Sequence, residues 1–188
     1  YHDMGLIGGL LQVMYAGTCS HVLPPASFVQ KPIRWLRAID KYRATVSGGP
    51  NFAFDACVDR TTKAERSSLD LSSWTLAFTG AEPIRRNSLQ RFSRAFESCG
   101  FDERSFFPCY GLAEATLMVS GGPRLRTPVF EAPSPQRDSR NDAETSKLVS
   151  CGRIVSGVDV RIVDPRTNLE LEPGGVGEIY VAGENVSQ

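Results

Sequence analysis

The sequence lacks an excess of charge of either sign. Its 188 residues carry 21 basic and 21 acidic side chains, which gives a formal net charge of zero. Without an overall positive field, the chain has no long-range electrostatic attraction to a polynucleotide or to an anionic membrane surface. We therefore expect no nucleic acid among its partners.

Paired cysteines are also missing. The five cysteines are odd in number and widely spread, and none belongs to a C-x-x-C pattern of the kind that zinc and redox sites use. This usage predicts reduced thiols in a cytoplasmic protein.

A long unbroken apolar run is absent as well. The most apolar stretch, residues 4–22, is interrupted by four glycines and by polar side chains, whereas a membrane span needs about 20 nearly continuous apolar residues. We expect no membrane span and interpret this stretch as a buried helix followed by a buried strand. We expect no targeting segment at its start. Because Tyr1 leads directly into a motif and Gln188 follows a predicted strand at once, we expect both ends to be cut.

What the sequence does contain is the composition of a folded domain, with 41% apolar and 22% charged residues. Apolar residues recur every three positions over 32–42 and predict a helix with one buried face. A second helix is predicted after Pro83, and Gly100 follows where a C-terminal cap belongs. The apolar stripe of this second helix consists of Leu89, Phe92, Phe96 and Cys99.

Short apolar runs alternate with these helices. Residues 74–78 precede the second helix, and residues 106–109 precede a third, shorter helical stretch. This alternation predicts an α/β fold with a mostly parallel sheet flanked by helices. Residues 158–163 and 176–181 are rich in β-formers and are separated by turn formers, so we expect the start of an antiparallel β unit there.

These patterns divide the chain into three parts. Residues 1–120 form an α/β subdomain, and residues 151–188 form the start of a β-barrel-like subdomain. Between them, residues 121–150 are rich in Pro, Arg, Ser and Asp and form a polar, insertion-like loop. Loops of this length are uncommon within compact domains and usually carry a function.

Three short segments are placed where ligands bind. H-D-M-G-L-I-G-G at 2–9 puts a His–Asp pair before an apolar helix, although the Asp alone is typical of an N-cap. F-T-G-A-E-P-I at 78–84 is a Gly-containing loop at a strand's carboxyl end, where α/β sheets bind ligands, although its Glu also suits a first helical turn. Y-G-L-A-E-A-T at 110–116 offers a flat ring for a purine, a glycine for close backbone approach and a carboxylate for Mg²⁺. A surface Tyr and a helix-start Glu are an equal alternative.

The order and spacing of five segments resemble one known pattern. The three segments above are joined by G-G-P-N-F-A-F-D at 48–55 and V-G-E-I-Y-V at 176–181. Together they resemble the adenylate-forming superfamily, and within it the fatty acyl-AMP ligases that are often joined to polyketide or peptide synthase assembly lines.

The resemblance implies an ATP-dependent ligase. Members of this family join a carboxylic acid to ATP, release pyrophosphate and leave an acyl-adenylate, and the acyl group then passes to a carrier-protein or coenzyme A thiol. Tyr110 would stack on adenine, Glu114 would bind Mg²⁺, and His2 would lie by the substrate carboxylate. The nucleotide-binding positions would be Gly80, Ala81, Glu82, Tyr110 and Gly111. The acyl channel would be lined by Gly8, Asn51 and Phe52.

The chain also departs from the pattern. Ala113 stands where the wider superfamily often has Thr, so a hydroxyl contact to phosphate is absent there. The phosphate loop with its Lys, the ribose-binding Asp and the small domain with the catalytic Lys have no counterpart between Tyr1 and Gln188. The resemblance therefore implies that flanking parts of the same polypeptide are needed, and we expect this chain alone to be inactive.

Several alternatives stay open. Residues 121–150 fall where fatty acyl-AMP ligases carry an insertion, which favours a carrier protein over coenzyme A as the acceptor. An acyl-CoA ligase and an amino-acid adenylation domain are the nearest alternatives, and a non-catalytic nucleotide- or lipid-binding module is a further one. A hydrolase is disfavoured because the chain has no G-x-S-x-G motif and only two histidines.

Overall fold

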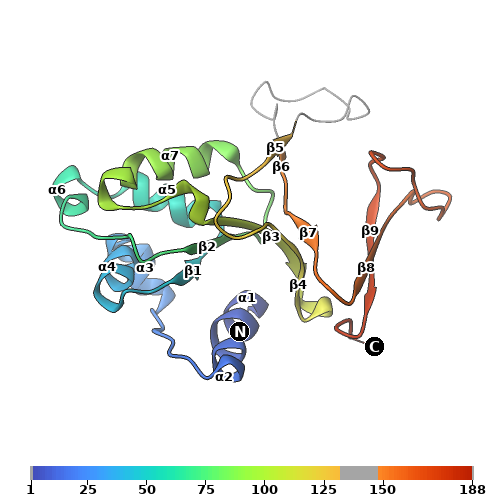
Figure 1. Cartoon of the computed structure of the whole chain (residues 1–188), viewed down its shortest axis with the longest axis horizontal. Helices are drawn as coiled ribbons and strands as arrows, with labels where there is room; N and C mark the ends of the chain where they lie inside the picture. Colours follow the sequence, from blue (N-terminus) through green and yellow to red (C-terminus); the bar gives the residue numbers. More distant parts are fainter. Residues whose placement is uncertain (1, 132–147, 188) are drawn as a thin grey trace.

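A five-stranded sheet organises the chain, in the order β1-β2-β3-β4-β7 (Figure 1). The structure is a computed structural model and describes residues 2–131 and 148–187. The strands are β1 (Val46–Gly48), β2 (Leu76–Thr79), β3 (Phe106–Leu112), β4 (Leu117–Gly121) and β7 (Arg153–Ile154). Strands β1, β2 and β3 are parallel, whereas β4 runs antiparallel to both of its neighbours. The predicted α/β class with a mostly parallel sheet is confirmed.

Helices cover one face of this sheet. The longer ones are α4 (Ile33–Tyr42), α5 (Asn51–Asp59) and α7 (Arg86–Phe96). They share one apolar cluster with the sheet residues Ala77 and Phe106. The shorter ones are α3 (Pro25–Gln30), α6 (Lys63–Arg66), η2 (Glu97–Cys99) and η3 (Glu103–Ser105). Both predicted helices are confirmed, because α4 buries its apolar stripe and the α7–η2 helix ends at Gly100 in the left-handed conformation.

The two faces of β2 have different surroundings. Ala77 and Thr79 are fully buried on the side of the helical cluster. Leu76 and Phe78 alternate with them, so they point to the opposite face. That opposite face is where the N-terminal helix lies, which consists of α1 (Asp3–Gly5), the π-helix η1 (Leu6–Leu11) and α2 (Gln12–Ala16). The sheet therefore separates a packed core from an open side.

The expected buried helix and buried strand over residues 4–22 are wrong in two respects. The helix is present, but none of its residues is buried, and Met14 and Tyr15 are 76% and 91% exposed. Residues 18–24 form no strand. They lead into Pro24 and Pro25, which lack the N–H group that a strand ladder requires.

The third helical stretch is also different from the expectation. After β3 the chain makes a single 3-10 turn, η4 (Ala113–Ala115), and then reverses into β4. Thr116 and Leu117 have positive φ angles of 49° and 85°, which end any helix at this point. The segment is therefore a tight hairpin between antiparallel strands.

The last third of the chain contains the predicted antiparallel unit. Strands β8 (Val158–Val163) and β9 (Glu178–Gly183) pair over six residues each. Within the predicted polar loop, β5 (Phe130–Glu131) pairs with β6 (Leu148–Val149), while residues 132–147 lie outside the described residues. The three-part domain division stays a prediction. Among the helices in the described parts of the chain, none has the length and apolar character to cross a membrane.

Candidate active site

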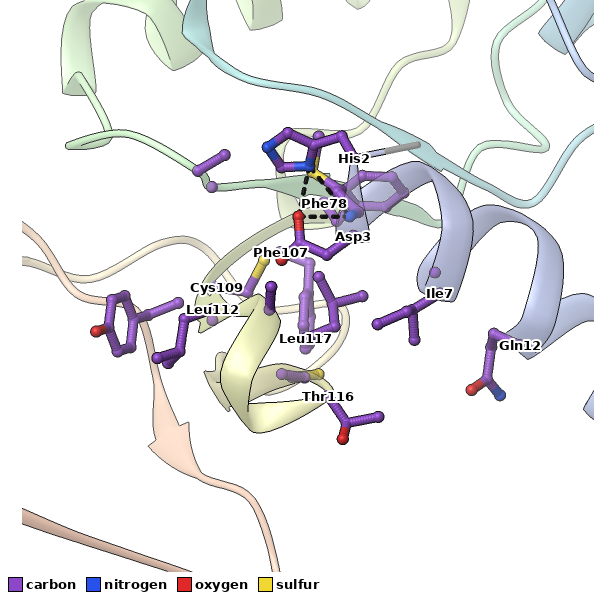
Figure 2. Close-up of a pocket in the computed structure, with 18 of the residues that line it drawn as sticks. His2, Asp3, Ile7, Gln12, Phe78, Phe107, Cys109, Leu112, Thr116 and Leu117 are labelled. Atoms are coloured by element: carbon purple, nitrogen blue, oxygen red, sulfur yellow. Dashed lines mark hydrogen bonds and ion pairs between the residues drawn. The ribbon is translucent and has the colours of Figure 1, made fainter. Parts of the chain in front are cut away.

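A cavity of about 730 Å³ lies on the open side of the sheet, between the N-terminal helix and the carboxyl ends of β2 and β3 (Figure 2). Figure 2 shows Ile7 and Gln12 on the helix and Phe107, Leu117 and Thr116 on the opposite wall. Four of the predicted nucleotide-binding residues line it, namely Gly80, Ala81, Tyr110 and Gly111. His2 and Gly8 also line it.

The parallel pairing of β2 and β3 brings two motifs together. Thr79 is in register with Pro108, so Gly80 follows the end of β2 beside Cys109, and Tyr110 lies next to it in the last part of β3. A Cβ atom on Gly80 would lie 2.7 Å from the Cys109 carbonyl oxygen, and only glycine permits that approach. The following Ala81 has a φ of 66°, which turns the chain away from the sheet. Glu82 is exposed and is not among the cavity-lining residues.

The hairpin between β3 and β4 forms the second wall. A Cβ on Gly111 would lie 1.6 Å from the Leu117 carbonyl oxygen, so the two strands touch backbone to backbone. The pairing register shifts between Tyr110 and Gly111, and β-bulges of this kind re-aim side chains next to active sites. The half-buried Tyr110 ring lines the cavity from this bulge.

Glu114 lies on the same hairpin, within η4, and is exposed. Its neighbours Ala113 and Thr116 line the cavity, but Glu114 itself does not. No group of three or more His, Cys, Asp or Glu side chains capable of holding a metal occurs in the described part of the chain. Mg²⁺ commonly binds to one or two carboxylates together with the phosphates of a substrate. Glu114 alone could therefore hold a Mg²⁺ ion that is also bound to the phosphates of a nucleotide.

His2 and Asp3 form a close pair at the other end of the cavity. The Nδ1 atom of His2 lies 2.5 Å from Oδ1 of Asp3, and the Met4 amide donates to the same carboxylate at 2.9 Å. The Met4 amide also donates to His2 Nδ1 at 3.2 Å. The His2 side chain is 67% exposed and lines the cavity.

Sequence reasoning missed most of the apolar wall. These side chains come from alternate positions of the strands and from the N-terminal helix, namely Ile7, Val46, Leu76, Phe78, Phe107, Leu117 and Met118. Strand alternation is a usable signal for Leu76 and Phe78, once Ala77 is assigned to the core. Gly8 fits against this wall, since a Cβ there would lie 3.1 Å from Cδ2 of Leu117.

The structure does not bring Asn51 and Phe52 to this cavity. Asn51 begins α5 and is 1% exposed; its Nδ2 donates to the Pro83 carbonyl at 3.0 Å, and its Oδ1 accepts from the Arg85 amide at 2.9 Å. Phe52 is 56% exposed and packs edge-on against Phe28. The geometry gives Asn51 a role in holding residues 83–85, and the acyl-channel assignment of both residues stays a prediction.

Cys109 contributes a neutral thiol to the cavity wall. Burial, and after it the neighbouring Cys151, raises the pKa of the Cys109 thiol to about 11. Because only a thiolate is a strong nucleophile, the thiol is protonated and unreactive near neutral pH. The cavity wall therefore supplies apolar contact and backbone groups rather than a covalent nucleophile.

Comparisons with known proteins agree on one family. The family described as AMP-binding enzyme matches residues 1–188. The chain is 43% identical to the medium-chain-fatty-acid–[acyl-carrier-protein] ligase TtuA of Teredinibacter turnerae, covering 100% of this chain and 30% of that protein. It is 40% identical to the ligase JamA of Moorena producens, which has the same description, covering 100% and 33%.

A solved structure gives the same result. The fatty acyl-adenylate ligase from L. pneumophila, in complex with acyl adenylate and pyrophosphate, superposes with a TM-score of 0.92 at 42% identity, covering 100% of this chain and 34% of that one. The chain thus spans about a third of the length of these relatives.

Proposed function

The chain belongs to the AMP-binding enzyme family, and we propose that it forms an interior part of a ligase that activates a fatty acid as its acyl-adenylate. In this reaction a carboxylate oxygen of the acid bonds to the α-phosphorus of ATP, and the bond from that phosphorus to pyrophosphate breaks. The observation that carries the proposal is the shared cavity, in which an apolar wall adjoins Gly80, Ala81, Tyr110 and Gly111. Such a cavity suits a molecule with an apolar chain at one end and a nucleotide at the other.

The nucleotide end of the proposed site uses backbone and an aromatic ring. Tyr110 offers its face to adenine, and the backbone at Gly80 and Gly111 lines the same cavity. Ala81 continues this wall, while Glu82 contributes from its exposed position beside it. The sheet edge holds these groups rigidly, because β2 and β3 pair in register up to Thr79 and Pro108.

The proposed metal contact is Glu114. A Mg²⁺ ion bound with the nucleotide would neutralise charge that develops on the phosphate oxygens. The exposed carboxylate of Glu114 supplies an oxygen ligand of the type that this ion prefers. Ala113 has no hydroxyl group that could contact a phosphate. In this proposal the hairpin therefore contacts the nucleotide through the Glu114 carboxylate and through its backbone.

His2 serves the acid substrate in this proposal. The His2 ring lies beside Asp3 and lines the cavity. In this proposal the ring orients the substrate carboxylate for attack, and positioning of this kind contributes much of the rate in phosphoryl-type chemistry. The acyl chain contacts Gly8 and the apolar wall around Phe107 and Leu117, whereas Asn51 and Phe52 are left out of the acyl site.

We further propose that flanking parts of the same polypeptide complete the site. Two observations support this: the chain spans about a third of its relatives, and apolar side chains are exposed on the N-terminal helix and on the β8–β9 hairpin. Examples are Met14 at 76%, Tyr15 at 91% and Tyr180 at 47% exposure. Folded proteins rarely leave such groups together on a free surface.

For the acyl acceptor we propose a carrier-protein thiol. The relatives TtuA and JamA are described as acyl-carrier-protein ligases, and the resemblance implies that residues 121–150 fall where the fatty acyl-AMP ligases carry an insertion. Coenzyme A remains the alternative, since a 39% identical relative is described as a putative fatty-acid–CoA ligase. The cytoplasmic location stays a prediction.

The test is fatty-acid-dependent exchange of pyrophosphate into ATP, measured on a polypeptide that carries this chain within the length of its relatives. We expect exchange with medium- to long-chain acids and none with amino acids. Tyr110→Leu should raise the KM for ATP about tenfold, because base stacking is worth about 1–3 kcal/mol. Tyr110→Phe keeps the ring and is the matched control. The absence of exchange with every acid in the panel would refute the ligase and favour a non-catalytic module.

The acceptor is tested in the same preparation. Acylated product should form on a phosphopantetheine-bearing carrier protein and not on coenzyme A when both are offered together. Product on coenzyme A alone would replace the carrier-protein proposal with the acyl-CoA alternative.

A further inference from the structure

The end of the described chain returns to the hairpin that carries Glu114. The Nδ2 atom of Asn185 donates to the Ala115 carbonyl at 2.8 Å, and the Thr116 hydroxyl donates to the Asn185 carbonyl at 2.6 Å. The Ser187 amide donates to the Glu114 carbonyl at 2.7 Å. These bonds join residues that are 69 to 73 positions apart in the sequence, from Thr116–Asn185 to Glu114–Ser187.

The hairpin needs such external contacts. Within the η4 turn itself, the described backbone bond is from the Thr116 amide to the Ala113 carbonyl at 3.1 Å. The next two residues, Thr116 and Leu117, have positive φ angles, and a conformation of this kind persists only when its surroundings impose it. Gly111 presses on the Leu117 carbonyl from inside the hairpin, and the segment 185–187 holds the adjacent carbonyls from outside.

The side-chain amide of Asn185 donates a hydrogen bond that an aspartate could not donate. Its Nδ2 holds the Ala115 carbonyl, while its Oδ1 is buried without a hydrogen-bond partner among the described residues. An aspartate at this position would keep the size of the side chain but would put a carboxylate against a carbonyl oxygen. Asn185 does not line the cavity, so it acts on the site only through the turn.

We propose that Asn185 is a positioning residue that fixes the Glu114 turn relative to Tyr110, and that it thereby couples the β8–β9 hairpin to the nucleotide site. This inference rests on the proposed ligase function. The side chain of Glu114 is exposed and lies on a short turn. The position of its carboxylate therefore depends on how firmly the backbone of that turn is held.

The first test is kinetic and uses the full-length ligase assay described above. In Asn185→Ala we expect the KM for Mg·ATP to rise about fivefold, because loss of one hydrogen bond is worth about 1 kcal/mol, where about 1.4 kcal/mol would be tenfold. The KM for the fatty acid should stay within about twofold, and added Mg²⁺ should partly restore activity. Asn185→Asp should be at least as impaired. Glu184→Ala changes an exposed neighbour and is the matched control.

A second test reads the contact without any activity. The Ser187 amide proton should exchange slowly in the wild-type chain, because it is bonded to Glu114, and rapidly in Asn185→Ala. Ser187→Pro removes the donor and should raise the KM for Mg·ATP in the same way, whereas Ser187→Ala keeps the amide and should not.

The outcomes separate this inference from the proposed function. If the wild type shows no exchange activity, the ligase proposal fails and the positioning role fails with it. If the wild type is active but Asn185→Ala and Ser187→Pro keep the wild-type KM for Mg·ATP, the positioning role alone is overturned. A lower melting temperature with an unchanged KM would also overturn it, since that result describes a purely structural contact.

Discussion

At the residue scale, the candidate site depends on two backbone contacts that no other residue type allows. Gly80 lies against the Cys109 carbonyl, and Gly111 lies against the Leu117 carbonyl. Both glycines stand next to a residue that lines the cavity, so a shift of either strand would move the cavity wall itself. The site is therefore more sensitive to an added methyl group at these positions than to the loss of many side chains.

Gly111→Ala should destabilise the chain strongly. The new Cβ would lie 1.6 Å from the Leu117 carbonyl oxygen, so the backbone must separate, at a cost of roughly 3 kcal/mol. Gly5→Ala is the matched control, because no atom lies within 4 Å of its Cβ position in the N-terminal helix and alanine favours helix over glycine by about 1 kcal/mol. Urea unfolding should show a much lower midpoint for the first variant only. Equal midpoints would contradict the close approach.

At the element scale, the sequence predicted those elements whose local signals agree with their packing. Helix α4 has apolar residues at a helical interval, and the α7–η2 helix has a glycine at its end. In both helices the local sequence signals therefore indicate the same structure as the packing. The Y-G-L-A-E-A-T segment has a helical composition, but the contact of Gly111 with Leu117 forces a hairpin. That contact joins two strands and leaves no local signal in the sequence.

The N-terminal helix illustrates a second limit. Its apolar composition was interpreted as burial, yet its side chains line a cavity on one side and remain exposed on another. Composition measures how much apolar surface an element has, not what covers it. For the same reason the G-G-P-N-F segment was assigned to the acyl channel by resemblance, while the structure uses Asn51 to hold another loop.

Asn51→Ala therefore tests a structural role against a substrate-binding one. Removing the buried Asn51 side chain takes away its hydrogen bonds with the Pro83 carbonyl and the Arg85 amide, which should cost about 2 kcal/mol in unfolding free energy at about 1 kcal/mol for each bond. The KM for the fatty acid should not change in the surviving folded protein. Phe52→Ala removes an exposed ring and should change neither quantity appreciably. A raised fatty-acid KM in both variants would restore the acyl-channel assignment.

At the scale of the whole molecule, the core and the site occupy opposite faces of one sheet. The core is an aromatic cluster in which Phe54, Trp74 and Phe92 contact one another. Of these three residues, the helical stripes of the sequence predicted only Phe92. The site was foreseeable where the motifs lie, at His2, Gly8 and the segments around Gly80 and Tyr110, which line one cavity. The Asn185 contact and most of the apolar wall depend on which distant segment and which face meet there, and these are not encoded locally.

This arrangement predicts how the 188-residue chain alone should bind nucleotides. The chain keeps the Tyr110 ring and the strand ends, but the resemblance assigns the triphosphate contacts to segments that this sequence does not contain. Stacking of a base on an aromatic ring is worth about 1–3 kcal/mol, which is less than the roughly 4.1 kcal/mol that corresponds to a Kd of about 1 mM. Calorimetry should therefore detect no binding of ATP at micromolar concentrations.

Adenosine and AMP give the control for this prediction. If only the base is recognised, then adenosine, AMP and ATP should bind within about threefold of one another, and Mg²⁺ should have little effect, because a charged phosphate gains from the metal only when the protein holds both. The longer ligase polypeptide should instead prefer ATP and require Mg²⁺. Micromolar, Mg²⁺-dependent binding of ATP by the 188-residue chain would mean that Glu114 and the hairpin hold the phosphates unaided, and the division of the site between this chain and its flanking parts would then be wrong.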